Sequence, residues 1–237
     1  MNKGRWDRSQ GYVNDNLFNK KWIELCRDKL SDDGTIWISG TFHNIFSVAQ
    51  QLTELNFHIL NVVTWVKTNP PPNLSCRYFT HSTEFIIWAR KTKHSSHYYN
   101  YELMKIINDG KQMRDVWHFP AIARWEKTCG KHPTQKPLAV LCRIIMASTH
   151  NNAWILDPFS GSGTTGIAAC LLGRNYLGIE KEMDFSNVSK RRYLELVDNI
   201  PLFLERLAIP NVSGLIDKTD QIKLCEEPPF YEKQLLI

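Results

Sequence analysis

The sequence lacks the features of membrane, secreted and zinc-binding proteins. Its 237 residues contain no run of about 18 apolar residues, the length that would cross a bilayer. The first residues, Met-Asn-Lys-Gly-Arg-Trp-Asp, include no apolar stretch like that of a secretory signal. Six cysteines occur without a CxxC pair, which argues against a bound metal and favours reduced thiols. We therefore expect a cytoplasmic protein with no membrane partner.

Composition and patterning favour one large α/β domain. With 43% hydrophobic and 22% charged residues, the chain is typical of a folded protein rather than a disordered one. Helical and strand-like patterns alternate, which predicts a mostly parallel, doubly wound sheet with an antiparallel edge and ligands at the strand carboxyl ends. Helices are expected at 18–30, 43–55, 136–149, 164–173 and 185–197, and strands at 35–40, 57–66, 83–90, 154–156 and 175–180. Strand 83–90 is expected to pair with 57–66 in antiparallel fashion, and most tryptophans are expected in the core: Trp6, Trp22, Trp37, Trp65, Trp88 and Trp154.

A glycine-rich turn between a strand and a helix is the strongest local signal. An apolar run ending in Asp157 leads into Pro-Phe-Ser-Gly-Ser-Gly163, and Thr164 begins an apolar-periodic helix. Glycines let the backbone approach a ligand closely, and the free N–H groups of a helix start suit a polar ligand. A second acid, Glu180, follows the next strand at about the distance of a ribose-binding carboxylate. The pattern predicts a nucleotide-type pocket.

Positive charge is concentrated in the middle of the chain. From residue 67 to 143 there are 13 Lys and Arg against 5 Asp and Glu, whereas residues 201–237 carry 4 against 6. A basic, aromatic-rich segment suits a phosphate-tracking surface, although an ordinary solvated face has the same composition. Candidates for DNA phosphate or base contacts are Arg77, Arg90, Lys91, Lys93, Lys111, Arg114 and Arg124.

The glycine motif Asp157-Pro-Phe159-Ser-Gly161-Ser-Gly163 and the upstream segment Gly130-Lys-His-Pro-Thr-Gln-Lys-Pro137 resemble, in this order, two motifs of amino-methylating DNA methyltransferases. The resemblance implies a Rossmann-like fold and S-adenosylmethionine as cofactor. It assigns Asp157 and Phe159 to the methionine amino group and adenine ring, and Glu180 to the ribose hydroxyls. The remaining implied cofactor contacts are Gly161, Gly163, Thr164, His132, Thr134, Gln135 and Lys136. Plainer roles stay open: Asp157 as a cap of the turn, Glu180 as an exposed strand end, and Thr134 as a helix N-cap.

The segment from Trp65 to Glu84 places the resemblance among permuted N6-adenine methyltransferases, closest to the GATC-type branch of bacterial restriction–modification systems. By that resemblance, residues 1–200 form the methyltransferase domain with a target-recognition insertion at about 91–127, followed by a tail at 201–237 of uncertain structure. The implied substrate is an adenine in double-stranded or single-stranded DNA, and the implied partner is a cognate restriction endonuclease without a stable complex. The setting would be a bacterial or phage-infected cytoplasm. N4-cytosine methylation uses the same scaffold and stays an alternative.

The sequence departs from the family at its catalytic tetrad. Members carry an Asp-Pro-Pro-Tyr-like tetrad upstream of the segment that matches Asn2 to Asp7, so we expect an N-terminally shortened enzyme and assign no catalytic residue. Asn69-Pro-Pro-Pro72 imitates the first three positions but offers proline where a ring must stack on the extruded base. An inactive fragment that only binds cofactor and DNA is the second hypothesis. Tyr78, Phe79 and His81 are candidates to flank an extruded base, with core packing as the alternative.

Overall fold

The computed structural model describes residues 9–130 and 132–208. The chain divides into two compact units, Met1–Ala123 and Arg124–Ile237. No helix in the described ranges combines the length and apolar character that a bilayer crossing requires. Trp6 and the tail beyond residue 208 lie outside the described residues, so the expectations for them remain expectations.

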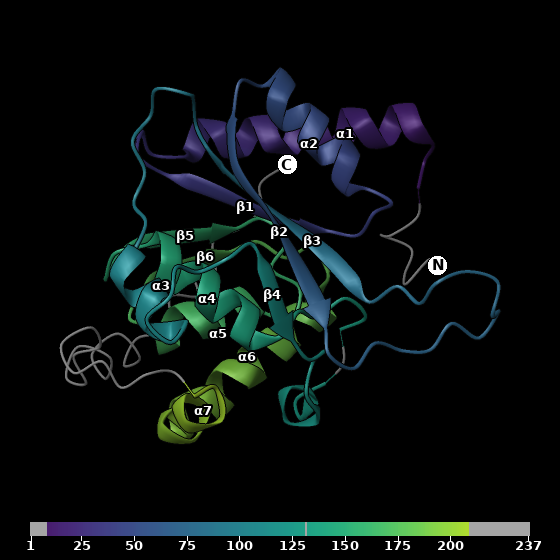
Figure 1. The fold of residues 1–237 in the computed structure, drawn as a ribbon. Helices are drawn as coiled ribbons and strands as arrows, with labels where there is room; N and C mark the ends of the chain where they lie inside the picture. Colours follow the sequence, from purple (N-terminus) through teal and green to yellow (C-terminus); the bar gives the residue numbers. More distant parts are fainter. Residues whose placement is uncertain (1–8, 131, 209–237) are drawn as a thin grey trace. The chain divides into compact units, whose positions relative to one another are not determined.

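The first unit is built on a four-stranded sheet with the order β1-β3-β2-β4 (Figure 1). β3 pairs in antiparallel fashion with both β1 and β2, whereas β4 pairs in parallel with β2. The strands are β1 (Thr35–Gly40), β2 (His58–Lys67), β3 (Thr83–Arg90) and β4 (Val116–Phe119). The predicted antiparallel pairing of the 57–66 and 83–90 strands is confirmed, and the antiparallel part is larger than the single edge expected.

Two helices, α1 (Tyr12–Lys29) and α2 (Ile45–Glu54), pack on one face of this sheet. Buried Ile23 of α1 and Leu52 of α2 meet Ile87 of the central strand in one hydrophobic cluster. The apolar residues of α2 recur at helical spacing, and burial of that stripe holds the helix on the sheet. A short third helix, α3 (Tyr101–Ile107), precedes β4 and begins with a side-chain cap, because Asn100 Oδ1 accepts a hydrogen bond from the Leu103 N–H at 3.2 Å.

The second unit pairs two short parallel strands, β5 (Trp154–Asp157) and β6 (Asn175–Gly178), and packs helix α5 against β6. Its core is formed by apolar residues of α4 and α5, including Leu138, Ile145, Ala168 and Leu171, all of which are buried. The helices of this unit are α4 (Leu138–Ser148), α5 (Thr164–Leu171), α6 (Met183–Asp198) and α7 (Ile200–Arg206), with a 3-10 turn, η2 (Arg124–Lys127), before them.

One expectation needs correction. Trp154 was expected in the core but is 72% exposed, because in a strand every second side chain points to the opposite face of the sheet.

Residues 91–127, where the target-recognition insertion is expected, contain α3 and β4. β4 belongs to the sheet, and its Trp117 is buried. That residues 91–127 recognise the DNA target stays a prediction.

Candidate cofactor-binding site

The glycine loop joins β5 to α5 in the second unit, as the sequence predicts. β5 ends at Asp157, and α5 begins at Thr164 directly after Gly163. Gly161 and Gly163 have φ angles of +53° and +74°, a region that L side chains rarely adopt. The loop therefore depends on glycine at these two positions to bring its backbone close to whatever it binds.

Asp157 organises the loop through both of its oxygens. Oδ1 accepts a hydrogen bond from the Phe159 N–H at 3.0 Å, and Oδ2 accepts one from the Thr165 hydroxyl at 2.6 Å. Burial raises the pKa of the Asp157 carboxyl, whereas these two hydrogen bonds lower it. The capping role left open by the sequence is thus present, and the ring of Phe159 stays 54% exposed beside it.

Glu180 lies against the same loop. Its Oε2 accepts a hydrogen bond from the Gly161 N–H at 2.7 Å, and its Oε1 accepts one from the Glu182 N–H at 2.8 Å. The backbone supports this approach, because Ser160 N–H donates to the Ile179 carbonyl at 3.0 Å just beyond the paired strands. Adjacent parallel strands end at the same edge of a sheet, so the two predicted acids, Asp157 and Glu180, converge on one loop.

The upstream segment contributes His132 to this site. A side-chain carbon placed on Gly161 would lie 3.1 Å from His132 Nε2, so the imidazole covers that glycine. The ring also packs edge-on against Phe185 of α6, with ring centroids 4.2 Å apart. Thr134 follows closely, since its N–H and its hydroxyl both lie 3.3 Å from His132 Nδ1.

Gln135, another predicted cofactor contact of that segment, is hydrogen-bonded to Glu126. Gln135 Nε2 donates to the Glu126 carbonyl at 2.8 Å, away from the glycine loop. Glu126, which is buried, accepts a hydrogen bond from the Leu138 N–H at 2.8 Å and so caps α4. The helix cap that the sequence allowed for Thr134 therefore comes from Glu126 instead.

The sequence did not predict the role of Arg192, which donates hydrogen bonds to residues of the glycine loop and of the start of α5. This α6 side chain is buried, and its Nη1 donates to the Ser162 carbonyl at 2.7 Å and to the Thr164 hydroxyl at 2.9 Å. Burial lowers the pKa of the guanidinium, while nearby carboxylates, Glu126 first, raise it. Helical spacing gave no signal for this role, because an arginine on an amphipathic helix normally faces solvent.

Comparison with known proteins shows the family to which the chain belongs. A family model described as DNA methylase, covering N6 and N4 methyltransferases, matches residues 1–191. The chain belongs to the N6/N4 DNA methylase family. The resemblance predicted from the two motifs is confirmed, together with the enzyme class and the α/β methyltransferase fold.

Relatives of the methylase include Type II methyltransferases. It is 60% identical over 196 residues to M2.MboI of Moraxella bovis, an alignment that covers 83% of this chain and 72% of that enzyme. It is 54% identical over 193 residues to M2.DpnII of Streptococcus pneumoniae, with 81% and 72% covered. Among solved structures, the complex of M1.HpyAVI with SAM matches with a TM-score of 0.62 and 34% identity, covering 75% of this chain and 80% of that one.

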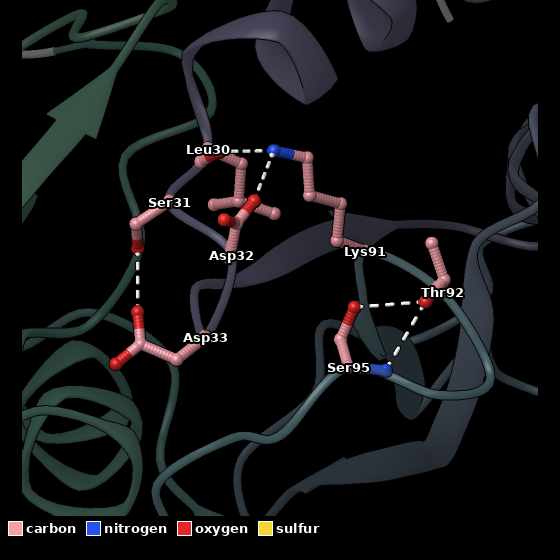
Figure 2. Close-up of polar contacts among 7 residues, drawn as sticks. All are labelled: Leu30, Ser31, Asp32, Asp33, Lys91, Thr92 and Ser95. Carbon is pink, nitrogen blue, oxygen red and sulfur yellow. Dashed lines mark hydrogen bonds and ion pairs between the residues drawn. The ribbon is translucent and has the colours of Figure 1, made fainter.

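Arg90 and Lys91, two of the basic residues proposed for DNA contact, form hydrogen bonds within the first unit of the methylase. Figure 2 shows Lys91 Nζ donating to the Leu30 carbonyl at 2.8 Å and lying 3.2 Å from Asp32. Arg90 donates to the carbonyls of Ser95 at 2.9 Å and Lys93 at 2.7 Å. These contacts account for both residues without a nucleic acid. DNA contact by either stays a prediction.

The other basic candidates of the methylase are exposed. Arg77 lies in the long connection between β2 and β3, Lys93 follows β3, and Lys111 and Arg114 lie between α3 and β4. Arg124 belongs to the second unit. The proline-rich alternative to the catalytic tetrad has a structural role, because Asn69 Oδ1 accepts a hydrogen bond from the Ala121 N–H at 2.7 Å.

Protonation of His132 in mild acid should lower the free energy of unfolding of the protein. Burial lowers the pKa of His132 below its usual 6.5; Lys136 and Arg192 lower it further, and Glu180 opposes them. The unfolded chain therefore takes up the proton first. The stability contributed by neutral His132 is complete above pH 6.5 and is lost as the pH falls through that value toward the lowered pKa.

The free energy of unfolding of the methylase, measured by urea titration from about pH 8 to pH 5, should accordingly fall more steeply than that of His132→Gln. Identical slopes for the two proteins would contradict this role of the imidazole. His150, an exposed histidine just after α4 in the same unit, provides the matched control as His150→Gln.

Proposed function

We propose that this methylase transfers a methyl group from S-adenosylmethionine to N6 of adenine in DNA, at GATC sites, as the modification enzyme of a restriction–modification system. The observation that carries the proposal is the convergence of Asp157, the glycine loop and Glu180 in the second unit. Its Type II relatives and the SAM complex of M1.HpyAVI support the reaction class. The GATC target rests on the resemblance of residues 65–84.

The residues present fit this cofactor. Glu180 offers a carboxylate just beyond the end of β6, and its oxygens can accept hydrogen bonds from the two hydroxyls of a ribose. Phe159, which is 54% exposed and whose N–H is hydrogen-bonded to the Asp157 carboxylate, supplies an aromatic ring of the kind on which an adenine can stack. A side-chain carbon on Gly161 would lie only 3.1 Å from His132 Nε2, and the φ of +53° disfavours any other residue, so both the packing and the backbone favour glycine there.

Bound S-adenosylmethionine supplies an electrophilic methyl group on a sulfonium. The chain's part is to bind and orient the donor, which raises the effective concentration of the reacting groups. Asp157 and Glu180 accept hydrogen bonds from backbone N–H groups of the loop, and Arg192 of α6 donates a hydrogen bond to the Ser162 carbonyl of the same loop. No Asp-Pro-Pro-Tyr sequence occurs in the chain, so the group that accepts hydrogen bonds from the adenine amine is left unassigned.

The partners follow from this function. DNA is the substrate, and a cognate restriction endonuclease would act on the same sites without forming a stable complex with the methylase. The bacterial relatives support a place in the cytoplasm, where DNA and S-adenosylmethionine occur together. The exposed basic residues of the first unit, Arg77, Lys93, Lys111 and Arg114, are proposed to contact phosphates, as is Arg124 of the second unit.

Glu180→Gln should weaken binding of S-adenosylmethionine by roughly 10- to 100-fold, because a hydrogen bond to a charged group contributes about 1.5–3 kcal/mol. Isothermal titration calorimetry measures this directly. Glu182→Gln is the matched control, since Glu182 is exposed two residues further along and offers the loop only its backbone N–H. Equal affinities of the two variants for S-adenosylmethionine would contradict the proposal that Glu180 binds the ribose.

Methyl transfer is tested with labelled S-adenosylmethionine and duplexes that contain or lack GATC. Label in N6-methyladenine of the GATC duplex alone is the expected result. Label in N4-methylcytosine would overturn the adenine assignment. Cofactor binding without incorporation into either duplex would show that the chain binds but does not transfer.

A further inference from the structure

Four rings gather at one end of the first unit, outside the cofactor site. Phe42, in the turn between β1 and α2, lies with its ring centroid 3.8 Å from that of His43 and 4.9 Å from that of His81. The His81 centroid is in turn 5.5 Å from that of Tyr78. Phe42, Tyr78 and both histidines are exposed. We call these four residues the ring cluster.

The connection that carries Tyr78 and His81 is anchored at its base. Lys67 N–H donates to the Ser82 carbonyl at 2.8 Å, and Lys67 Nζ forms an ion pair with Glu84 at 2.7 Å. Figure 1 shows this connection extending well beyond the ends of β2 and β3. The long loop therefore leaves the sheet from a fixed position.

Its tip is also organised. Asn73 Nδ2 donates to the Tyr78 carbonyl at 2.5 Å, and Asn73 Oδ1 accepts from the Ser75 N–H at 3.1 Å. Cys76 takes a positive φ of 52°, which turns the chain back toward the ring cluster. Tyr78 is thus presented at a defined place while 61% of its surface stays open to solvent.

The charge around the ring cluster suits an anionic partner. Neither the 68–82 connection nor the 41–53 segment contains an aspartate or glutamate. Arg77, which precedes Tyr78, is exposed, and the nearest carboxylate along the loop, Glu84, is already paired with Lys67. Phe79 is 96% and Leu74 91% exposed, so the loop presents apolar side chains on either side of Arg77.

Exposed aromatic rings beside positive charge are the groups that bind unpaired nucleic acid, because every base has a face that can stack and every linkage carries a negative charge. We propose that the ring cluster stacks on an unpaired base of the DNA substrate, with Arg77 on the adjacent phosphate. The proposal rests on the proposed function, in which methylation of a base inside a duplex requires that base to leave the helix.

The test compares binding of a short single-stranded GATC oligonucleotide, with 2-aminopurine in place of adenine, to the full chain and its variants. Tyr78→Leu should weaken binding about tenfold and restore 2-aminopurine fluorescence, since stacking on an aromatic ring contributes about 1–3 kcal/mol per base. Tyr78→Phe keeps the ring and should bind like the unchanged protein. Tyr12→Leu is the matched control, because Tyr12 is an exposed tyrosine of α1 in the same unit.

S-adenosylmethionine binding is measured on the same proteins and separates the two proposals. Equal DNA affinities for Tyr78→Leu and Tyr12→Leu, with cofactor binding intact, would overturn the ring cluster alone. Ring-dependent DNA binding without cofactor binding would overturn the proposed function alone. A loss in Tyr78→Phe as large as in Tyr78→Leu would show that the phenol hydroxyl, and not stacking, makes the contact.

Discussion

Arg192→Ala should destabilise the second unit by about 3–5 kcal/mol, the cost of removing one partner from a buried charged network. The change leaves the Ser162 carbonyl and the Thr164 hydroxyl without their donor and removes the positive charge that faces Glu126. Because Ser162 and Thr164 flank Gly163, the start of α5 should loosen as well. We expect binding of S-adenosylmethionine to fall below detection in this variant, which urea unfolding and calorimetry measure on the same sample.

Two further variants define what the guanidinium does. Arg192→Lys keeps the charge, but its side chain is one bond shorter and its ammonium cannot take the place of Nη1, which makes the bonds to Ser162 and Thr164, so it should lose about half as much stability as the alanine variant. Asn187→Ala, at an exposed position of the same helix, is the control for helix α6 and should change stability by less than about 0.5 kcal/mol. An alanine variant as stable as this control would contradict the role of Arg192.

Gly163→Ala should have the second largest effect, a loss of roughly 2–4 kcal/mol together with cofactor binding. Two costs add at this position. The φ of +74° disfavours an L side chain by about 1–2 kcal/mol. A side-chain carbon would also overlap Ser189 of α6, with its Cβ at 2.9 Å and its Cα at 3.4 Å, and overpacking of this kind costs about 1–3 kcal/mol.

The chain offers a control that separates these two costs. Gly173 has a similar φ of +67°, but a carbon added there would have nothing within 4 Å. Gly173→Ala should therefore show the backbone cost alone. Adding Ser189→Gly to Gly163→Ala should recover the packing part, so that the two changes are strongly non-additive in unfolding experiments. Equal losses at Gly163 and Gly173 would mean that the contact with α6 does not constrain the loop.

Local patterns were sufficient to predict the glycine loop and the strand and helix on either side of it. The apolar run before Asp157, the glycines and the helix from Thr164 are consecutive in the sequence, and they form β5, the loop and α5. Glu180 could be placed beside them because neighbouring parallel strands end at one sheet edge. The strands at 35–40 and 83–90 were predicted with the bounds that the structure has.

Features that depend on distant partners were missed. β4 has four residues and exists through its parallel pairing with β2, some fifty residues earlier, so its own sequence carries little signal. α3 and α7 have seven residues each, too few for a periodic pattern to stand out. Arg192 and Glu126 were overlooked because charged residues are mostly exposed, and only the folded unit shows that these two are buried with partners.

Charge counting predicted a basic region but not the use of each residue in it. Arg90 and Lys91 lie in a positive stretch of sequence, yet their donors reach backbone carbonyls of the first unit. An arginine or lysine that holds two loops together has the same sequence signature as one that holds a phosphate. The exposed Arg77 and Lys93 are the better candidates for mutation in DNA-binding experiments.

The most direct test is calorimetric titration of the full chain with S-adenosylmethionine and with its demethylated product, alongside Glu180→Gln and Gly163→Ala. We predict saturable binding at one site per chain, weakened in the first variant and lost in the second. Absence of binding by well-folded protein, or binding that neither substitution changes, would contradict a cofactor site at the glycine loop.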